Sequence, residues 1–287
     1  MSAGWYVLHR YVDGTFKVVR DPFVQLFSVH AFVKKNDHLQ QLPLAFVLMS
    51  RRRAVDYRGV FEALIAAMPR RPCVQAVVAD FEAAVWSAVR HVLPGVTQRG
   101  CSFHFSQAIW RSVQNVGLQS AYQTDDRVNR ICRLTMALPF LPATVIPSTF
   151  DSELEFSENS VRPELQAHID YVRRNWVDSE VWPPSTWSVY LQPTRTNNNV
   201  EGWHRRLNGK AGHSKLNLYQ LVQLLRTEAT LADVGVKMMS EGGAARLQRK
   251  KYKRMNTYIC ERWGEYGAGT RSAASLLRAC SHAVKHM

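Results

Sequence analysis

The first fifty residues alternate between apolar runs and polar breaks at the spacing of short strands. Three stretches are rich in β-branched and aromatic side chains: Trp5 to Val19, Phe23 to Lys34 and Leu42 to Ser50. Asp21-Pro22 and the polar stretch from Lys35 to Gln41 predict the turns between them. We therefore expect three strands at hairpin spacing, in antiparallel order.

The next fifty residues alternate between helical and strand patterns. Tyr57 to Met68 has apolar residues at helical spacing, and Cys73 to Ala79 is a continuous apolar run, as in a buried strand. Phe81 to Leu93 again predicts a helix, and Val96 to Gly100 a short strand. This order is typical of an α/β fold in which helices flank a mixed sheet.

The pattern becomes mainly helical after Gly117. We expect the first part of a core at residues 1–117 and a helical insertion at 118–195, with an extended stretch between Pro184 and Pro193. A helix at 196–215 would return to the core, and a basic helical region would occupy 216–287.

The net charge of the chain bears on its binding partner. The chain has 37 Lys and Arg against 23 Asp and Glu, a formal charge of +14. Such an excess favours an anionic partner, usually nucleic acid, over a role in solubility alone, which a surface of mixed sign would serve better. Basic clusters can neutralise phosphates without reading bases. The candidate DNA-binding residues are Arg51, Arg52, Arg53, Arg205, Arg206, Arg249, Lys250, Lys251, Lys253 and Arg254.

Cysteine usage and hydropathy bear on the compartment. The five cysteines are widely spaced and form no Cys-x-x-Cys pair, which favours a reducing compartment over a disulfide framework. We see no apolar signal segment and no run of membrane-spanning length, so we expect an intracellular protein without a membrane partner. The stretch RLQRKKYKR is either a nuclear address or a DNA-contact face.

Three acids stand at the ends of predicted elements. Asp13 lies in a strand-like run, Asp80 ends the apolar strand, and Glu201 begins a helix after Asn197-Asn198-Asn199. Converging carboxylates suit Mg²⁺ or Mn²⁺, and two such ions support in-line displacement at a phosphodiester. Each acid also has a simpler interpretation. Asp13-Gly14 could form a hairpin turn, Asp80 could cap the next helix, and Glu201 could pair with Arg205.

A second candidate site is the Cys-x-x-His pair Cys101 and His104. Together with His204 they could hold zinc, with Cys132 or His213 as weaker ligands. The alternative is a buried thiol beside a hydrogen-bonded histidine. Trp203 could lie at the site or in the core, whereas most other tryptophans fall on core patterns.

With these residues in view, the chain resembles the transposase core of Mutator-like elements, the MULE family. The segments that carry the resemblance include YVDGTFKVVRDPFVQLFSVHAF, VVADFEAAVWSAVRHVLPGV, RGCSFHFSQAIWRSVQNVGLQSAY and WSVYLQPTRTNNNVEGWHRRLN. The resemblance implies a ribonuclease H-like fold and a DDE site of Asp13, Asp80 and Glu201, with Cys101 and His104 as the family's Cys-x-x-His pair. It also implies transposon ends and target DNA as partners, and leaves room for a homo-oligomer.

Two departures from the family pattern shape the alternatives. The first predicted strand begins almost at Met1, so we expect the family's N-terminal DNA-binding module to be absent. Asn199 stands where we would expect an acid. The leading hypothesis is a metal-dependent transposase of nuclear location. The rivals are a non-catalytic DNA-binding protein derived from such an element, and a fragment of a longer gene.

Overall fold

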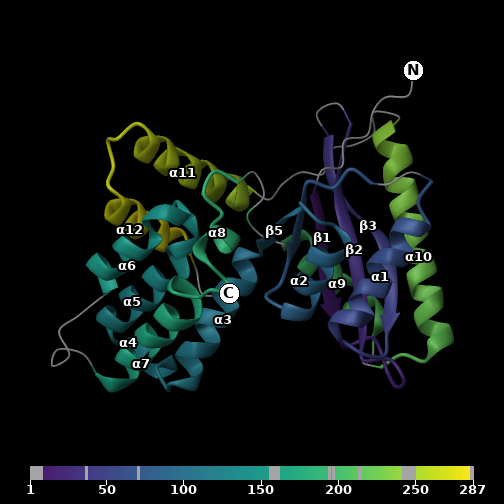
Figure 1. Cartoon of the computed structure of the whole chain (residues 1–287), viewed down its shortest axis with the longest axis horizontal. Helices are drawn as coiled ribbons and strands as arrows, with labels where there is room; N and C mark the ends of the chain where they lie inside the picture. Colours follow the sequence, from purple (N-terminus) through teal and green to yellow (C-terminus); the bar gives the residue numbers. More distant parts are fainter. Residues whose placement is uncertain are drawn as a thin grey trace. The chain divides into compact units, whose positions relative to one another are not determined.

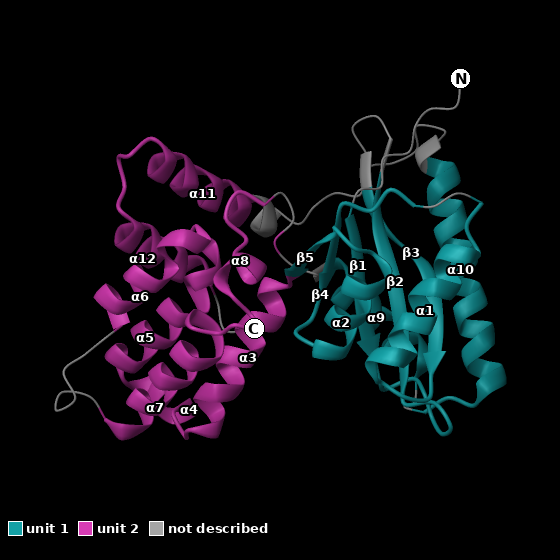
Figure 2. Cartoon of the chain, in the orientation of Figure 1, with its two compact units in different colours: residues 1–99, 197–247 teal, residues 100–196, 248–287 magenta. Residues whose placement is uncertain are grey.

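A computed structural model describes residues 9–35, 38–69, 72–154, 162–192, 195, 198–212, 215–240 and 250–284 (Figure 1). The chain divides into two compact units (Figure 2). Unit 1 comprises residues 1–99 and 197–247, and unit 2 comprises residues 100–196 and 248–287. Each unit therefore uses two separate stretches of the chain.

Unit 1 is built on a five-stranded sheet in the order β3-β2-β1-β4-β5. β1 pairs antiparallel with β2, β2 antiparallel with β3, and β1 parallel with β4. This mixed sheet with flanking helices confirms the predicted α/β fold. The strands are β1 His9–Thr15, β2 Gln25–Lys35, β3 His38–Met49, β4 Ala76–Ala79 and β5 Thr97–Gly100.

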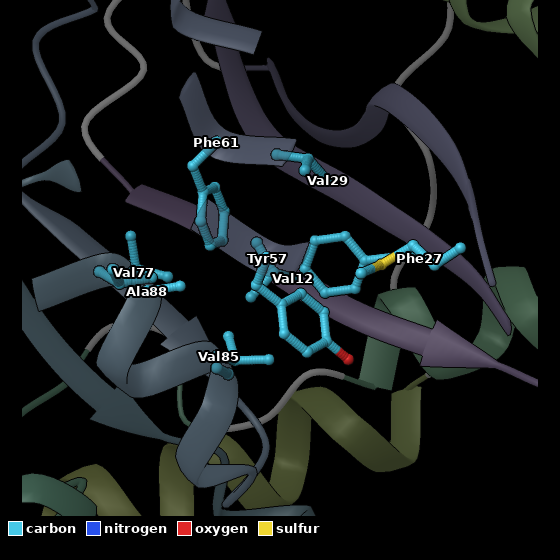
Figure 3. Close-up of a cluster of buried hydrophobic side chains, with 11 residues drawn as sticks. Val12, Phe27, Val29, Tyr57, Phe61, Val77, Val85 and Ala88 are labelled. Carbon is cyan, nitrogen blue, oxygen red and sulfur yellow. The ribbon is translucent and has the colours of Figure 1, made fainter. Parts of the chain in front are cut away.

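The helices α1 (Ala54–Ala66) and α2 (Ala83–Val92) cover one face of the sheet. Alternate residues of the strands point toward them and meet apolar side chains of both helices (Figure 3). The resulting core includes Val12, Phe27, Val29, Tyr57, Phe61, Val77, Val85 and Ala88.

The opposite face is covered by α9 (Asn198–Ala211) and α10 (Leu218–Ser240). The buried residues of α9 recur every three or four positions, which puts them on one side of the helix. Trp203, Leu207 and Ala211 among them pack on Leu26 and on the first turns of α10. The chain thus returns after residue 196 to the face that carries the intervening residues of the strands. The buried α9 residues are Val200, Trp203, His204, Leu207 and Ala211.

Two local predictions need correction and one is confirmed. The turn expected from Lys35 to Gln41 is too long, because β2 runs to Lys35 and β3 begins at His38. Strand pairing there uses main-chain groups, which do not require apolar side chains. The stretch expected to be extended after Pro184 instead starts with the short helix α8 (Pro184–Trp187), since proline is well tolerated in a first helical turn. The turn at Asp21-Pro22 is confirmed: that peptide is cis, and Phe23 N–H donates to the Arg20 carbonyl at 3.0 Å.

In the described parts of unit 2, the regular elements after Gly100 are all helices, as predicted for most of residues 118–195. By packing, α3 and the last two helices belong to unit 2, whereas α10 belongs to unit 1. The roles proposed from the sequence for residues 1–117, 118–195, 196–215 and 216–287 stay predictions. Among the residues that the structure describes, no helix combines the length and the apolar character needed to cross a membrane. The α-helices of unit 2 in its described parts are α3 Ser102–Asn115, α4 Gln119–Thr124, α5 Asp126–Ala137, α6 Ile146–Leu154, α7 Pro163–Val172, α8, α11 Lys250–Gly267 and α12 Ala273–Ala283. Short 3₁₀ helices at Leu138–Phe140 and Ala143–Val145 and a π-helix at Arg173–Val177 lie between them.

Candidate metal centre

Asp13 lies inside a strand and not in a turn. It pairs with Ser28 across β1 and β2, so the hairpin interpretation of Asp13-Gly14 is wrong. Its side chain is 5% exposed, and Oδ1 accepts a hydrogen bond of 2.8 Å from the main-chain N–H of Gly14. The carboxylate faces α9, because Val12 beside it in the strand points to the opposite core.

Asp80 lies beside Asp13 by the register of the sheet. Tyr11 of β1 is aligned with Val78 of β4, and the two acids each come two residues later on these parallel strands. Asp80, directly after the end of β4, therefore falls beside Asp13 in β1 and on the same side of the sheet. The cap residue of α2 is Glu82, so Asp80 is not the helix cap. Its carbonyl accepts the indole N–H of Trp86 at 2.7 Å.

Glu201 and His204 reach the same face from α9. They are three residues apart, which puts both on one side of the helix. Asp13, Glu201 and His204 offer ligand atoms that all lie within 4.8 Å of one another. Across the described parts of the chain, they are the only group of three or more His, Cys, Asp and Glu with this spacing. Asp80 is outside this group, although it lies beside Asp13.

A polar chain lies behind the group, and the sequence reasoning did not find it. Ser28 is fully buried, and its hydroxyl is 3.2 Å from Nε2 of His204 and 2.9 Å from Nε2 of His30. Nδ1 of His204 is 3.4 Å from Oδ2 of Asp13. Burial, with a smaller contribution from the charges of His204 and Arg206, lowers the pKa of His30 to about 3, so its ring is neutral near pH 7. The signal in the sequence was two polar residues alternating with apolar ones in a buried strand.

Trp203 joins the site helix to α10. It is 4% exposed and stacks on Phe46, with ring centroids 5.4 Å apart, so it packs in the core and does not present a surface for base stacking. Its indole N–H donates to Oε2 of Glu228 at 2.7 Å. Lys210 and Arg206 also donate to this carboxylate, at 2.7 and 3.3 Å. Burial raises the pKa of Glu228, but these three hydrogen bonds outweigh it and the pKa is lowered overall.

The three arginines at 51–53 are exposed just before α1. Arg52 donates to Glu82 at 2.5 Å, and Arg53 forms two side-chain hydrogen bonds of 3.0 Å with Asp56. These carboxylates offset part of the positive charge that the cluster would present to phosphates. The assignment of all three to DNA binding stays a prediction.

The other basic candidates are divided between the units. Arg205 and Arg206 are exposed on α9, where Arg206 also contacts Glu228. Arg254 is exposed on α11 in unit 2. The side chains of Arg249, Lys250, Lys251 and Lys253 lie outside the described residues.

The Cys-x-x-His pair is not placed in a metal-ligand group. Cys101 is fully buried at the start of α3, and His104 is half-buried one turn later, both in unit 2. His204 belongs to unit 1, and His213 lies outside the described residues. A zinc site at Cys101 and His104 stays a prediction.

Comparison with known protein families finds a match to the first third of the chain. Residues 10–108 match the model of the MULE transposase domain. The matched range holds Asp13, Asp80, Cys101 and His104, whereas Glu201 and His204 lie beyond it. No curated protein matches the chain. The resemblance to Mutator-like transposases is thus confirmed over the first three strands, α1, β4, α2, β5 and the first half of α3.

Proposed function

From the match of residues 10–108 to the MULE transposase domain, we propose that the chain is a metal-dependent enzyme of DNA cleavage and strand transfer. One observation carries the proposal: β1 and α9, distant in sequence, bring Asp13, Glu201 and His204 together on the sheet face that also holds Asp80. Acids gathered in this way have a shared function more often than scattered surface acids do.

The donor set fits a divalent cation. Asp13 is almost fully buried and has Glu201 within 4.8 Å, an arrangement in which two negative charges repel unless a positive charge lies between them. Carboxylate oxygens are the ligands that Mg²⁺ and Mn²⁺ prefer. Asp13, Asp80 and Glu201 would hold the ion or ions. When bound, such ions activate the attacking oxygen and stabilise the leaving oxygen of a phosphodiester.

The residues of this chain hold the reacting groups in place. Asp13 is fixed within β1, Asp80 directly follows the paired strand β4, and Glu201 lies on a helix that is packed on the same sheet. In cleavage, a water oxygen bonds to phosphorus and the P–O3′ bond breaks, which leaves a 3′-hydroxyl and a 5′-phosphate. That hydroxyl then attacks a phosphodiester of target DNA and displaces another 3′-oxygen. In each step the attacking oxygen gives a proton to solvent, and the leaving 3′-oxygen takes one up to become a hydroxyl.

In this proposal, basic residues supply the contacts to DNA. The formal charge of +14 favours association with a polyanion, and Arg205 and Arg206 are exposed in the helical turn that follows Glu201. The proposed partners are transposon ends and target DNA, and the proposed location is the nucleus.

The test is nicking of supercoiled plasmid DNA, and cleavage of DNA that carries the terminal repeats of the element, with Mg²⁺ or Mn²⁺. Asp80→Asn is compared with wild type and with the matched control Asp233→Asn, an exposed acid on α10. Loss of a ligand should lower the rate more than about 100-fold, beyond the loss typical for residues that support ligands. Equal activity of Asp80→Asn and wild type would contradict the proposal. DNA binding without cleavage in all three proteins would favour the non-catalytic alternative.

A further inference from the structure

Glu201 and His204 form a Glu-x-x-His pair on α9. Residues at this spacing project from one side of a helix and can bind one ion together. His204 is 5% exposed, and its Nδ1 is 3.4 Å from Oδ2 of Asp13. The imidazole therefore lies among the carboxylates and not on the rim of the site.

The hydrogen bonds of Ser28 put a proton on Nε2 of His204. A hydroxyl has one hydrogen to donate and two lone pairs to accept with. Ser28 has three polar neighbours: the main-chain carbonyl of Asp13 at 3.3 Å, Nε2 of His204 at 3.2 Å and Nε2 of His30 at 2.9 Å. A carbonyl can only accept. All three contacts are hydrogen bonds only if Ser28 donates to the carbonyl and both histidines donate to Ser28.

In that arrangement the neutral ring of His204 carries its proton on Nε2 and has a lone pair on Nδ1. The lone pair is directed toward a carboxylate oxygen, and two acceptors at this distance attract each other only through a cation. Two ligands of one ion, each at about 2.1 Å, are separated by about 3.0 to 3.4 Å in octahedral or tetrahedral geometry. The 3.4 Å between Nδ1 and Oδ2 matches that separation.

We propose that His204 binds the metal directly through Nδ1, and that this nitrogen makes the site favour Mn²⁺ over Mg²⁺. The inference rests on the proposed function for the identity of the site, and it adds the ligand and the ion preference. Imidazole suits transition-metal ions, whereas oxygen and water ligands suit Mg²⁺. Ser28 is then a positioning residue, because it orients the ring without touching the ion.

A competing role predicts a different signature. If His204 instead carried a proton on both nitrogens and donated Nδ1–H to Asp13, it would orient the carboxylate and no nitrogen would bind the ion. Mn²⁺ is the probe that separates the two cases, because pulsed electron paramagnetic resonance detects the ¹⁴N coupling of a bound imidazole. We expect that coupling in the full-length wild-type chain loaded with Mn²⁺ alone.

Three variants test the assignment. The amide of asparagine reaches about as far as Nδ1, and that of glutamine about as far as Nε2. His204→Gln should therefore keep the contact with Ser28 and lose both the ¹⁴N coupling and roughly tenfold or more in Mn²⁺ affinity. His204→Asn should put an oxygen in the ligand position, and so shift the ratio of Mn²⁺ to Mg²⁺ affinity toward Mg²⁺. His282→Gln, an exposed histidine in unit 2, should change neither quantity.

The outcomes separate this inference from the proposed function. A wild-type Mn²⁺ complex without imidazole coupling would overturn the inference even if DNA cleavage is observed, as would coupling that persists in His204→Gln. Coupling in a protein that cleaves no DNA would support the inference and contradict the proposed function. If His204→Gln fails to fold, His204→Asn replaces it, and an absence of coupling in the wild type overturns the inference whatever the variants do.

Discussion

The indole nitrogen of Trp203 lies 2.7 Å from the carboxylate of Glu228, and this buried hydrogen bond ties the helix of the candidate metal centre to α10. Trp203 lies between the proposed ligands Glu201 and His204 in the sequence, so this hydrogen bond fixes the helical turn that carries both. Lys210 and Arg206, which also lie on α9, form ion pairs with the same carboxylate. Glu228 thus holds three side chains of the site helix.

Replacement of Glu228 should therefore destabilise unit 1. Glu228→Ala leaves the buried indole N–H without its acceptor, which costs about 1–3 kcal/mol of unfolding free energy. Glu228→Gln can keep one acceptor and should lose less. Denaturant unfolding measures both effects. The exposed control Glu261→Gln should change the unfolding free energy by less than about 0.5 kcal/mol. Equal stability of Glu228→Ala and wild type would show that the hydrogen bond contributes nothing.

Metal binding should stabilise the fold through the three clustered residues. An ion that binds only the folded state adds about 2.7 kcal/mol of unfolding free energy at a concentration one hundred times its dissociation constant. We expect Mn²⁺ to raise the melting temperature of the wild type, and a chelator to reverse the increase. Asp13→Asn and Glu201→Gln should lose most of the increase, because each removes a charged ligand. An equal increase in Asp13→Asn and wild type would place the ion elsewhere.

Stability of unit 2 should depend on pH through His168. This residue is fully buried between Ser112 and Thr135, whose hydroxyls lie 3.0 and 3.2 Å from its ring nitrogens. Burial lowers its pKa to about 4, below the ordinary value of 6.5. The unfolded chain therefore binds this proton more tightly. The unfolding free energy therefore keeps its full value above pH 6.5. It decreases as the pH falls toward 4, by up to about 1.4 kcal/mol per pH unit, because protons bind the unfolded chain preferentially.

The measurement is the unfolding free energy between pH 4 and pH 7. His168→Gln should be less stable at pH 7 and should show a smaller slope below pH 6.5, since its side chain does not titrate. His30 contributes a slope of the same sign in both proteins, because its pKa is also lowered by burial. The difference between the two slopes therefore isolates His168. Identical slopes would contradict the assignment.

Arg205 should contribute more to DNA affinity than Arg53. Arg205 is exposed on the helix that carries Glu201, whereas Arg53 is already paired with Asp56. Arg205→Ala should weaken binding to DNA duplexes of any sequence, and should reduce the slope of log affinity against log salt by about 1. Arg53→Ala is the matched control and should change the slope less. Fluorescence anisotropy at several salt concentrations gives both slopes. A larger change of slope in Arg53→Ala than in Arg205→Ala would contradict the prediction.

The elements could be predicted from the sequence because their signals are local. Apolar runs such as Cys73 to Ala79 and the helical spacing in Tyr57 to Met68 reflect which side chains each segment buries, and these segments fold as strand and helix close to the predicted bounds. The placement of Asp80 and Glu201 at element ends could be read in the same way. The turn before β3 was predicted too long, because strand pairing there joins main-chain groups whatever their side chains.

By itself, then, the sequence determined the α/β class, the helical character of residues 118–195, the resemblance to Mutator-like transposases and the candidate acids. Only the tertiary structure decided which acids meet. The register of β1 against β2 and β4 puts Ser28 and Asp80 beside Asp13, and the packing of α9 brings Glu201 and His204 to that face. Such contacts join segments far apart in the chain, so no local pattern specifies them. They follow from pairing and packing of whole elements.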